Sequence, residues 1–294
     1  MRVVADGYRW LSREISLRRE LHNARRRLLT SADFTSDEKR LISKVSLRVH
    51  REDAMCDGNA FHYLSVGVSA MRCIEEAFRS AGKEFLEGSI LDFPSGFGRV
   101  LRFLRARFPD AEITAAEIDQ RALDFCSRTF SVTPYLSKSP FNDLRLPRRF
   151  DLIWCGSLFT HIDEHAASDL LQFFHDHLSD RGVCVFTTHG QRCVEWMQSK
   201  KVTYALTADA QRELIRGFQS RGYGYADYAG HTGYGISAVS HQRMLDLSGR
   251  YGRWKEAVFL EHAWDNHQDV YALAMQEQKI QHIREDKECS EGRG

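Results

Sequence analysis

Acidic residues and glycines mark the ends of two apolar segments in the stretch 90–119. Residues 89–93 form a mainly apolar run that contains Asp92, and the turn Ser95-Gly96-Phe97-Gly98 separates them from a helical pattern of apolar residues over 100–108. Glycines allow positive φ and let a ligand approach the backbone closely. The first turn of a helix offers unpaired amides and the positive end of the helix dipole, which suit a carboxylate or phosphate. We therefore expect an anionic ligand group at residues 96–99.

The second apolar segment, residues 112–118, ends in another acid. Glu117 lies about 25 residues after Asp92, the distance at which an acid commonly accepts hydrogen bonds from ribose hydroxyls. We predict Glu117 as a ribose ligand, so the stretch indicates a nucleoside cofactor. The chain lacks the three-glycine dinucleotide fingerprint and any G-x-x-x-x-G-K-[ST] motif. Their absence argues against NAD or a nucleoside triphosphate.

Strand and helix patterns alternate through the middle of the chain. Residues 150–157 form an apolar run typical of a buried strand, and residues 164–178 have helical spacing. A turn at 180–182 precedes another buried strand at 183–188. This alternation predicts an α/β domain with a parallel sheet.

The stretch 90–119 resembles motif I and the following strand of class I S-adenosylmethionine-dependent methyltransferases. The turn reads D-F-P-S-G-F-G, with Pro94 where that family has the first glycine of its G-x-G-x-G motif. Proline removes one backbone donor, so the loop must bind the methionine end of the cofactor without that amide. The resemblance implies a doubly wound, Rossmann-like sheet of seven strands, mostly parallel. Its antiparallel terminal hairpin would be formed by 254–261 and 269–275.

The resemblance also implies S-adenosyl-L-methionine as the cofactor and assigns residues to it. Asp92 would order the loop or meet the amino group of the cofactor through water. Residues 156–158 would contact its methionine part, and the connection 137–146 would contact adenine. There Phe141 could stack on the ring, while Asn142 or Asp143 could accept from the adenine amino group or bridge a turn. The expected cofactor ligands are Asp92, Pro94, Ser95, Gly96, Gly98, Arg99, Glu117, Ile118, Phe141, Asn142, Asp143, Gly156, Ser157 and Leu158.

Methyl transfer from a sulfonium is an in-line displacement that depends mainly on holding the nucleophile against the methyl carbon. An alcohol acceptor would benefit from a general base, for which histidine is suited. His161 follows the fourth strand and His189 the fifth, and Asp163 is a further candidate. Each could instead be a structural residue. A metal site is not expected, because His161 and His165 have no third ligand nearby.

The acceptor is less well defined. The stretch 221–235 interleaves glycines with aromatic residues, which predicts an irregular loop that contacts substrate; an ordinary exposed loop is the alternative. The candidates there are Tyr223, Tyr225, Tyr228, His231 and Tyr234. The run 264–275 resembles methyltransferases associated with bacterial surface-glycan assembly. After the fourth strand the chain reads C-G-S-L rather than the [ND]-P-P-[YF] of nucleobase N-methyltransferases. We therefore predict O-methylation of a glycan or small molecule.

The amino-terminal segment is a basic amphipathic helix, with arginines such as Arg9, Arg18 and Arg26 beside regularly spaced leucines. It could dock on an anionic membrane surface or an acidic partner, but packing of its apolar side on the catalytic domain is the favoured interpretation. Further short and long helices are expected at 36–48 and 61–82. The alternative function is a non-catalytic cofactor-fold module that binds partners through the basic helix.

Length and composition suit one catalytic domain with additions. We predict a helical arm at 1–58, a catalytic domain at 59–278 with an acceptor-loop insertion at about 190–237, and a flexible tail at 279–294. The net charge of +1 gives no general attraction to nucleic acid. With no signal peptide and no apolar run approaching about 18 residues, we expect a cytoplasmic protein.

Overall fold

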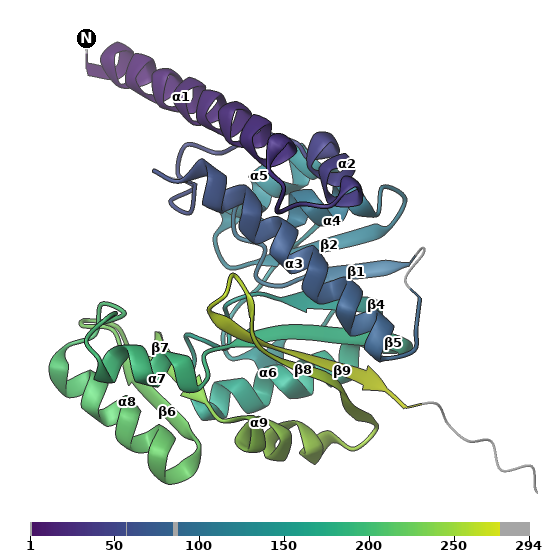
Figure 1. The fold of residues 1–294 in the computed structure, drawn as a ribbon, viewed down its shortest axis with the longest axis vertical. Helices are drawn as coiled ribbons and strands as arrows, with labels where there is room; N and C mark the ends of the chain where they lie inside the picture. Colours follow the sequence, from purple (N-terminus) through teal and green to yellow (C-terminus); the bar gives the residue numbers. More distant parts are fainter. Residues whose placement is uncertain (1, 57, 85–87, 277–294) are drawn as a thin grey trace, which may run out of the picture.

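A seven-stranded sheet forms the centre of the molecule, with strand order β3-β2-β1-β4-β5-β9-β8 (Figure 1). The structure is a computed structural model that describes residues 2–56, 58–84 and 88–276 and, in the first helix, side chains from Arg13 onward. The first five strands in this order pair in parallel, whereas β9 is antiparallel to both of its neighbours. The predicted Rossmann-like sheet with its terminal hairpin is therefore confirmed. The strands are β1 (Ser89–Asp92), β2 (Glu112–Glu117), β3 (Thr133–Leu136), β4 (Phe150–Cys155), β5 (Leu178–Thr188), β8 (Trp254–Trp264) and β9 (Gln268–Met275).

Helices cover both faces of this sheet, so its central strands are apolar on both sides. All residues of β4 and β9 are buried. The expected turn at 180–182 was wrong, because β5 begins at Leu178 and absorbs these residues in a shift of its register against β4. The helices next to the sheet are α3 (Ala60–Ser80), α4 (Leu101–Arg107), α5 (Gln120–Phe130), α6 (Glu164–His177) and α9 (His241–Ser248), with short 3-10 helices η1 (Phe141–Asp143) and η2 (Gly249–Tyr251).

Two amino-terminal helices, α1 (Arg2–Thr30) and α2 (Ser36–Lys44), extend the core beyond α3. Leu17, Leu21 and Leu28 of α1 are buried in the same cluster as α3, so the described part of the amphipathic helix packs on the domain as favoured. The side chains of Arg9 and Leu11 lie outside the described residues, as does the expected tail 279–294. The helix predicted over 36–48 ends at Lys44 because Val45 is extended.

A buried arginine explains the course of the chain after α2. Arg102 on α4 is 1% exposed and donates to the carbonyl oxygens of Ser46 and Arg48, both at 2.9 Å. It also donates to the hydroxyl oxygen of Tyr63 at 2.8 Å, and that hydroxyl donates to Asp53 at 2.6 Å. These bonds hold the non-helical segment 45–56 against helices α3 and α4. Tyr63 is fully buried and therefore belongs to the core.

A separate lobe follows β5 and is formed by α7 (Gln191–Gln198), α8 (Ala208–Arg221) and the hairpin β6 (Tyr223–Asp227) and β7 (Gly235–Val239). The expectation of an irregular loop over 221–235 was therefore wrong outside the turn 228–234. A Cβ at Gly224 would lie 2.0 Å from the Leu214 carbonyl oxygen, and one at Gly235 would lie 1.9 Å from that of Ala226. These glycines allow neighbouring backbones to pack closely, and the hairpin needs them for this packing rather than for flexibility.

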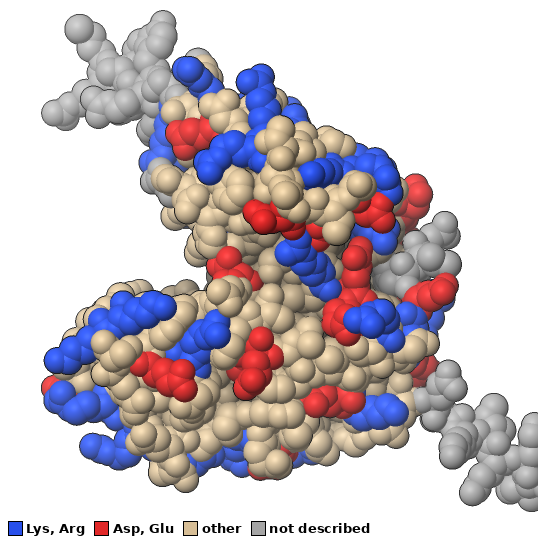
Figure 2. All heavy atoms as spheres, viewed as in Figure 1, with Lys and Arg blue, Asp and Glu red and all other residues tan. Residues whose placement is uncertain are grey.

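A deep cleft separates this lobe from the part of the molecule that carries α1 and α2 (Figures 1 and 2). The cleft opens beside the carboxyl ends of the parallel strands, the edge at which open α/β sheets bind ligands. Among the described helices, none has the length and apolar character to cross a membrane.

Replacing Arg102 with leucine should destabilise the fold, because several buried carbonyl and hydroxyl oxygens would lose their donor. We expect the free energy of unfolding to fall by about 3 kcal/mol, measured by urea denaturation. Arg107→Leu is the matched control, since this arginine of the same helix is exposed and pairs with Glu75 at the surface. Equal effects of the two changes would contradict this account of Arg102.

Candidate active site

A cavity of about 320 Å³ lies at the carboxyl ends of β1, β2 and β4. It brings together residues that are distant in the sequence, from the turn after β1 to the tip of the β8–β9 hairpin. Most of the predicted cofactor ligands line it, together with one predicted catalytic residue and one predicted substrate residue. The predicted residues in its wall are Asp92, Pro94, Ser95, Gly96, Arg99, Glu117, Ile118, Gly156, Ser157, Leu158, His161 and Tyr234.

The sequence interpretation missed six lining residues: Asp53, Met55, Phe97, Val100, Trp154 and Trp264. Asp53 and Met55 belong to the segment 45–56, which has no periodic pattern and is held by Arg102. Trp264 comes from the far end of the chain. Only its place as a large aromatic residue at the end of an expected strand could have suggested a role.

The Glu117 carboxylate organises the turn after β1. Its Oε2 accepts from the Gly96 amide at 2.7 Å, and its Oε1 accepts from the amides of Ile118 and Asp119 at 2.8 and 3.2 Å. The amides of Ser95 and Gly98 bond to carbonyl oxygens at 3.0 and 2.9 Å. Because three of these turn amides are already engaged, they do not support the expected anion site.

Gly98 is outside the cavity wall and serves packing. It has a φ of +82°, and a Cβ there would lie 2.4 Å from the ring of Phe130. The last glycine of the motif I turn therefore allows α5 to approach the turn.

Three acids, Asp53, Asp92 and Glu117, and one arginine, Arg99, line the cavity and give it its charge pattern. Asp92 is 1% exposed, and its Oδ2 has no hydrogen-bond partner among the described residues. Burial and the nearby Glu117 carboxylate raise the pKa of Asp92 well above its ordinary value. A buried, unpaired carboxylate that lines a cavity is suited to a cationic or hydrogen-bond-donating ligand group.

Arg99 supplies the opposite charge. Its guanidinium lies 5.6 Å from the ring centroid of Trp264 and 3.9 Å from the sulfur of Met55. In the part of the chain that the structure describes, no carboxylate forms an ion pair with it. Burial lowers the pKa of Arg99. A partly buried guanidinium without a counterion is a ready partner for a ligand carboxylate.

His161 faces the cavity from the loop after β4. Its Nδ1 lies 2.8 Å from the Gly235 carbonyl oxygen, which can only accept, so Nδ1 carries the proton. Nε2 then has a free lone pair, and it has no partner among the described residues. Burial lowers the pKa of His161, and Tyr234 stacks on its ring at 5.0 Å. The arrangement is that of a neutral histidine able to accept a proton.

The other candidate bases have structural contacts. Asp163 caps α6 by accepting from the Ala166 amide at 2.8 Å. His189 is 4% exposed, outside the cavity wall, and its Nδ1 lies 3.2 Å from the Ser237 carbonyl oxygen. Its ring packs on Tyr204 and His267, where the lobe meets the β8–β9 hairpin. Neither residue is brought to the cavity.

The predicted adenine residues also lie outside the cavity wall. Phe141 packs edge-on against Phe93, with ring centroids 6.0 Å apart, in the apolar layer under η1. Asn142 and Asp143 continue η1 at the surface. Among the residues that do line the cavity, Ile118 is 67% exposed and Met55 64% exposed. These apolar side chains offer a surface for a flat ring.

The aromatic candidates of the hairpin divide into core and surface. Tyr223 is 2% exposed and donates to the Ile162 carbonyl oxygen at 3.0 Å, so its assignment to substrate was wrong. The Tyr225 hydroxyl donates to Asp227. Tyr228 and His231 surround Tyr234, with ring centroids 5.5 and 6.2 Å from it. Tyr234 is 46% exposed and lines the cavity. The group formed by Tyr228, His231 and Tyr234 therefore lies at the mouth of the cavity.

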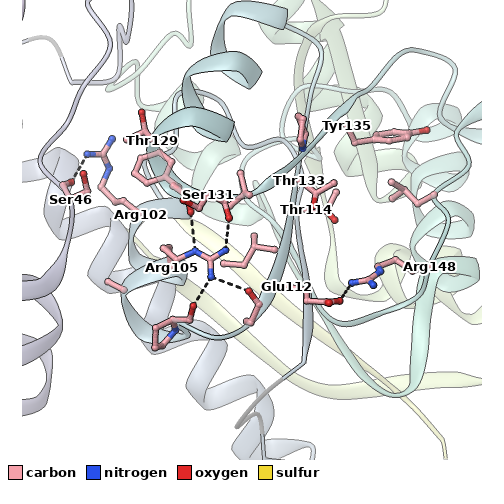
Figure 3. Close-up of a pocket in the computed structure, with 18 of the residues that line it drawn as sticks. Ser46, Arg102, Arg105, Glu112, Thr114, Thr129, Ser131, Thr133, Tyr135 and Arg148 are labelled. Carbon is pink, nitrogen blue, oxygen red and sulfur yellow. Dashed lines mark hydrogen bonds and ion pairs between the residues drawn. The ribbon is translucent and has the colours of Figure 1, made fainter.

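Figure 3 shows a larger cavity of about 1290 Å³ near the amino ends of β2 and β3, away from these residues. Arg105 in its wall donates to four carbonyl oxygens, and Arg148 pairs with Glu112. The guanidinium groups of the larger cavity thus stabilise the fold, and we place the candidate site at the smaller cavity.

The buried His189 should make stability depend on pH. Burial lowers its pKa to about 3, so between that value and its ordinary 6.5 the unfolded chain binds a proton that the folded chain does not. Its contribution should therefore reduce the free energy of unfolding by about 1.4 kcal/mol for each pH unit below 6.5. Urea denaturation from pH 7.5 to 5 should show a shallower pH slope in His189→Gln, but an unchanged slope in the exposed-site control His231→Gln. Equal slopes for wild type and His189→Gln would refute this account.

Comparison with known proteins agrees with this geometry. Residues 91–184 match the family model of a methyltransferase domain. No curated protein matches the chain in sequence. Its fold is similar to that of an S-adenosylmethionine-dependent methyltransferase from Clostridium acetobutylicum, with 14% identity and a TM-score of 0.50 over 71% of this chain and 91% of that one.

Two further solved structures have lower TM-scores. DesVI of Streptomyces venezuelae is 14% identical, with a TM-score of 0.49 over 74% of this chain and 96% of its own. The PH0226 protein of Pyrococcus horikoshii is 12% identical, with a TM-score of 0.48 over 73% and 95%. Residues 91–184 are therefore a methyltransferase domain, and the chain has the fold of an S-adenosylmethionine-dependent methyltransferase.

Proposed function

We propose that the protein transfers a methyl group from S-adenosyl-L-methionine to an oxygen of a glycan or small-molecule acceptor, with His161 as general base. The observation that carries the proposal is the set of ionisable groups in one cavity, whose wall contains the carboxyl groups of Asp92 and Glu117 and the guanidinium of Arg99. A donor with an ammonium group, a carboxylate and ribose hydroxyls complements this pattern. When bound, it supplies an electrophilic methyl group.

Each group of the donor has a partner of suitable chemistry in the wall. The unpartnered Oδ2 of Asp92 can accept from the ammonium, which would restore the ionised carboxylate. Glu117 can accept from ribose hydroxyls with the lone pairs left by the turn amides. Arg99 can pair with the carboxylate. Ile118 and Met55 offer apolar contact to the adenine ring, while an adenine role of Phe141, Asn142 and Asp143 has no support from their positions.

The acceptor would enter through the cleft beside the lobe (Figure 2). The rings of Tyr228, His231 and Tyr234 form a surface at the cavity mouth on which a sugar or aromatic ring can pack. His161 stacks under Tyr234, so its free Nε2 lies close to a ring held there. It would accept the acceptor hydroxyl proton as the oxygen attacks the methyl carbon. We further propose that the protein is cytoplasmic. Its domain limits in this proposal are a helical arm at 1–58, a catalytic domain at 59–278 and a tail at 279–294.

Glu117→Ala should weaken donor binding, because the mutation removes both the ribose partner and the acceptor that holds the Gly96 amide. We expect at least a tenfold rise in the dissociation constant of S-adenosylhomocysteine, measured by calorimetry. Glu112→Ala is the control, since Glu112 is an exposed acid at the opposite end of β2. Unchanged affinity in Glu117→Ala would remove this residue from the site.

His161→Gln should lower turnover by about 10² or more while donor affinity stays within about twofold. Because burial lowers the pKa of His161, the acid limb of the wild-type rate profile, where the imidazole becomes protonated, should have its midpoint below the ordinary value of 6.5. The variant should lack this acid limb. His165→Gln, which changes an exposed histidine at the start of α6, is the control. A wild-type rate and pH profile in His161→Gln would leave this histidine with a scaffold role.

A further inference from the structure

A closed ring of hydrogen bonds lies beneath the cavity at Ser157. The Ser157 amide donates to the Thr187 hydroxyl oxygen at 2.8 Å. The Thr187 hydroxyl donates to Oε1 of Gln268 at 2.6 Å, and Nε2 of Gln268 donates to Oγ of Ser157 at 2.6 Å. The ring joins β5, β9 and the loop after β4, and Thr187 is fully buried.

The direction of these bonds fixes the direction of the Ser157 hydroxyl. Thr187 has one hydrogen, which it gives to Oε1, so the amide nitrogen of Gln268 is the group that faces Ser157. Oγ of Ser157 therefore receives a hydrogen bond inside the ring, and in the described part of the chain its own hydrogen has no acceptor. Ser157 lines the cavity, so this hydrogen is available to a ligand.

Backbone strain supports a role for this arrangement. Ser157 has a φ of +66°, a conformation that costs free energy in a residue with a side chain. Glycine would relieve the strain, so a serine held here by three partners is consistent with a need for its hydroxyl. The Thr160 hydroxyl also donates to the Ser157 carbonyl oxygen at 2.6 Å, which further fixes the residue.

The neighbours of Ser157 indicate the kind of group that would accept this hydrogen. A Cβ on the adjacent Gly156 would lie 2.9 Å from the ring of Trp264, and the Arg99 guanidinium lies over that same ring. Ser157 directly follows Gly156, and it lines the same cavity as Arg99 and Trp264. A guanidinium and a hydroxyl donor together suit a carboxylate.

We propose that the Ser157 hydroxyl donates a hydrogen bond to the donor carboxylate, and that Gln268 and Thr187 are positioning residues that aim it. This inference rests on the proposed function. It assigns a role in ligand recognition to Gln268, on the last strand, and to Thr187, on β5, neither of which lines the cavity.

The test compares two ligands by calorimetry: S-adenosylhomocysteine, which has the carboxylate, and 5′-methylthioadenosine, which lacks it. Ser157→Gly keeps the positive φ and removes the hydroxyl. It should weaken binding of the first ligand roughly tenfold or more and leave the second within about twofold. Gln268→Met and Thr187→Val should lower affinity with the same ligand preference, and Thr188→Val, the neighbouring change on β5, should not.

A double-mutant cycle distinguishes positioning from a purely structural role. If Gln268 acts through Ser157, Gln268→Met should not further change the ratio of the two affinities when Ser157 is already glycine. Equal losses for both ligands, additive losses in the double mutant, or no loss in Ser157→Gly would each overturn the proposal. Thermal unfolding of every variant identifies any that is not folded, and the remaining substitutions then decide. Failure of the wild type to bind either ligand would instead refute the proposed function.

Discussion

The tip of the β8–β9 hairpin is the constraint on which the site depends. Asp265 and Asn266 adopt positive φ there, which forms the turn and points consecutive side chains in different directions. Trp264 packs edge-on against Trp154 under the cavity, and its indole nitrogen donates to the Val66 carbonyl oxygen on α3. Because the residues of this tip together contact α3, β4 and α7, its geometry aligns parts of the chain that are otherwise far apart.

The remaining contacts of the tip extend this alignment to the lobe and to the loop after β4. Asp265 pairs with His62 on α3 at 3.3 Å, and Asn266 accepts from Arg192 on α7. His267 lies 2.7 Å from the Tyr204 hydroxyl. Gln268 completes the buried ring with Ser157. The cavity wall, the lobe after β5 and the loop after β4 therefore share one support, the kind of preorganisation that in-line transfer requires.

The site combines this rigidity with charges that the fold leaves unpaired. Asp92 and Arg99 are both desolvated, and neither is paired with an oppositely charged side chain among the residues described. Such groups are unfavourable for the folded chain without ligand. A ligand that pairs with both regains this free energy on binding, so the same groups that weaken the fold favour a zwitterionic donor. The buried contacts of Arg102 and of the hairpin tip stabilise the fold and offset this unfavourable free energy.

Much of the fold was predictable from local pattern. The apolar runs of β1, β2 and β4 and the turn between β1 and α4 follow from residue type and spacing, and their resemblance to a known family was sufficient to predict the methyltransferase domain. Errors arose where a residue type has two physical uses. The glycines of 221–235 were interpreted as signs of a flexible loop, but Gly224 and Gly235 allow close packing of strands and helix. Tyr223 was interpreted as a substrate contact, but its ring is in the core.

The sequence by itself determined the sheet, its terminal hairpin, and the acids Asp92 and Glu117 at strand ends, because each depends on interactions between residues near one another in the chain. Tertiary structure decided which side chains meet at the cavity. Asp53, Met55 and Trp264 reach it from segments without a local signal, and His161 rather than His189 faces it because Gly235 of a distant strand holds its Nδ1. These placements depend on packing between elements far apart in sequence, which no local pattern encodes.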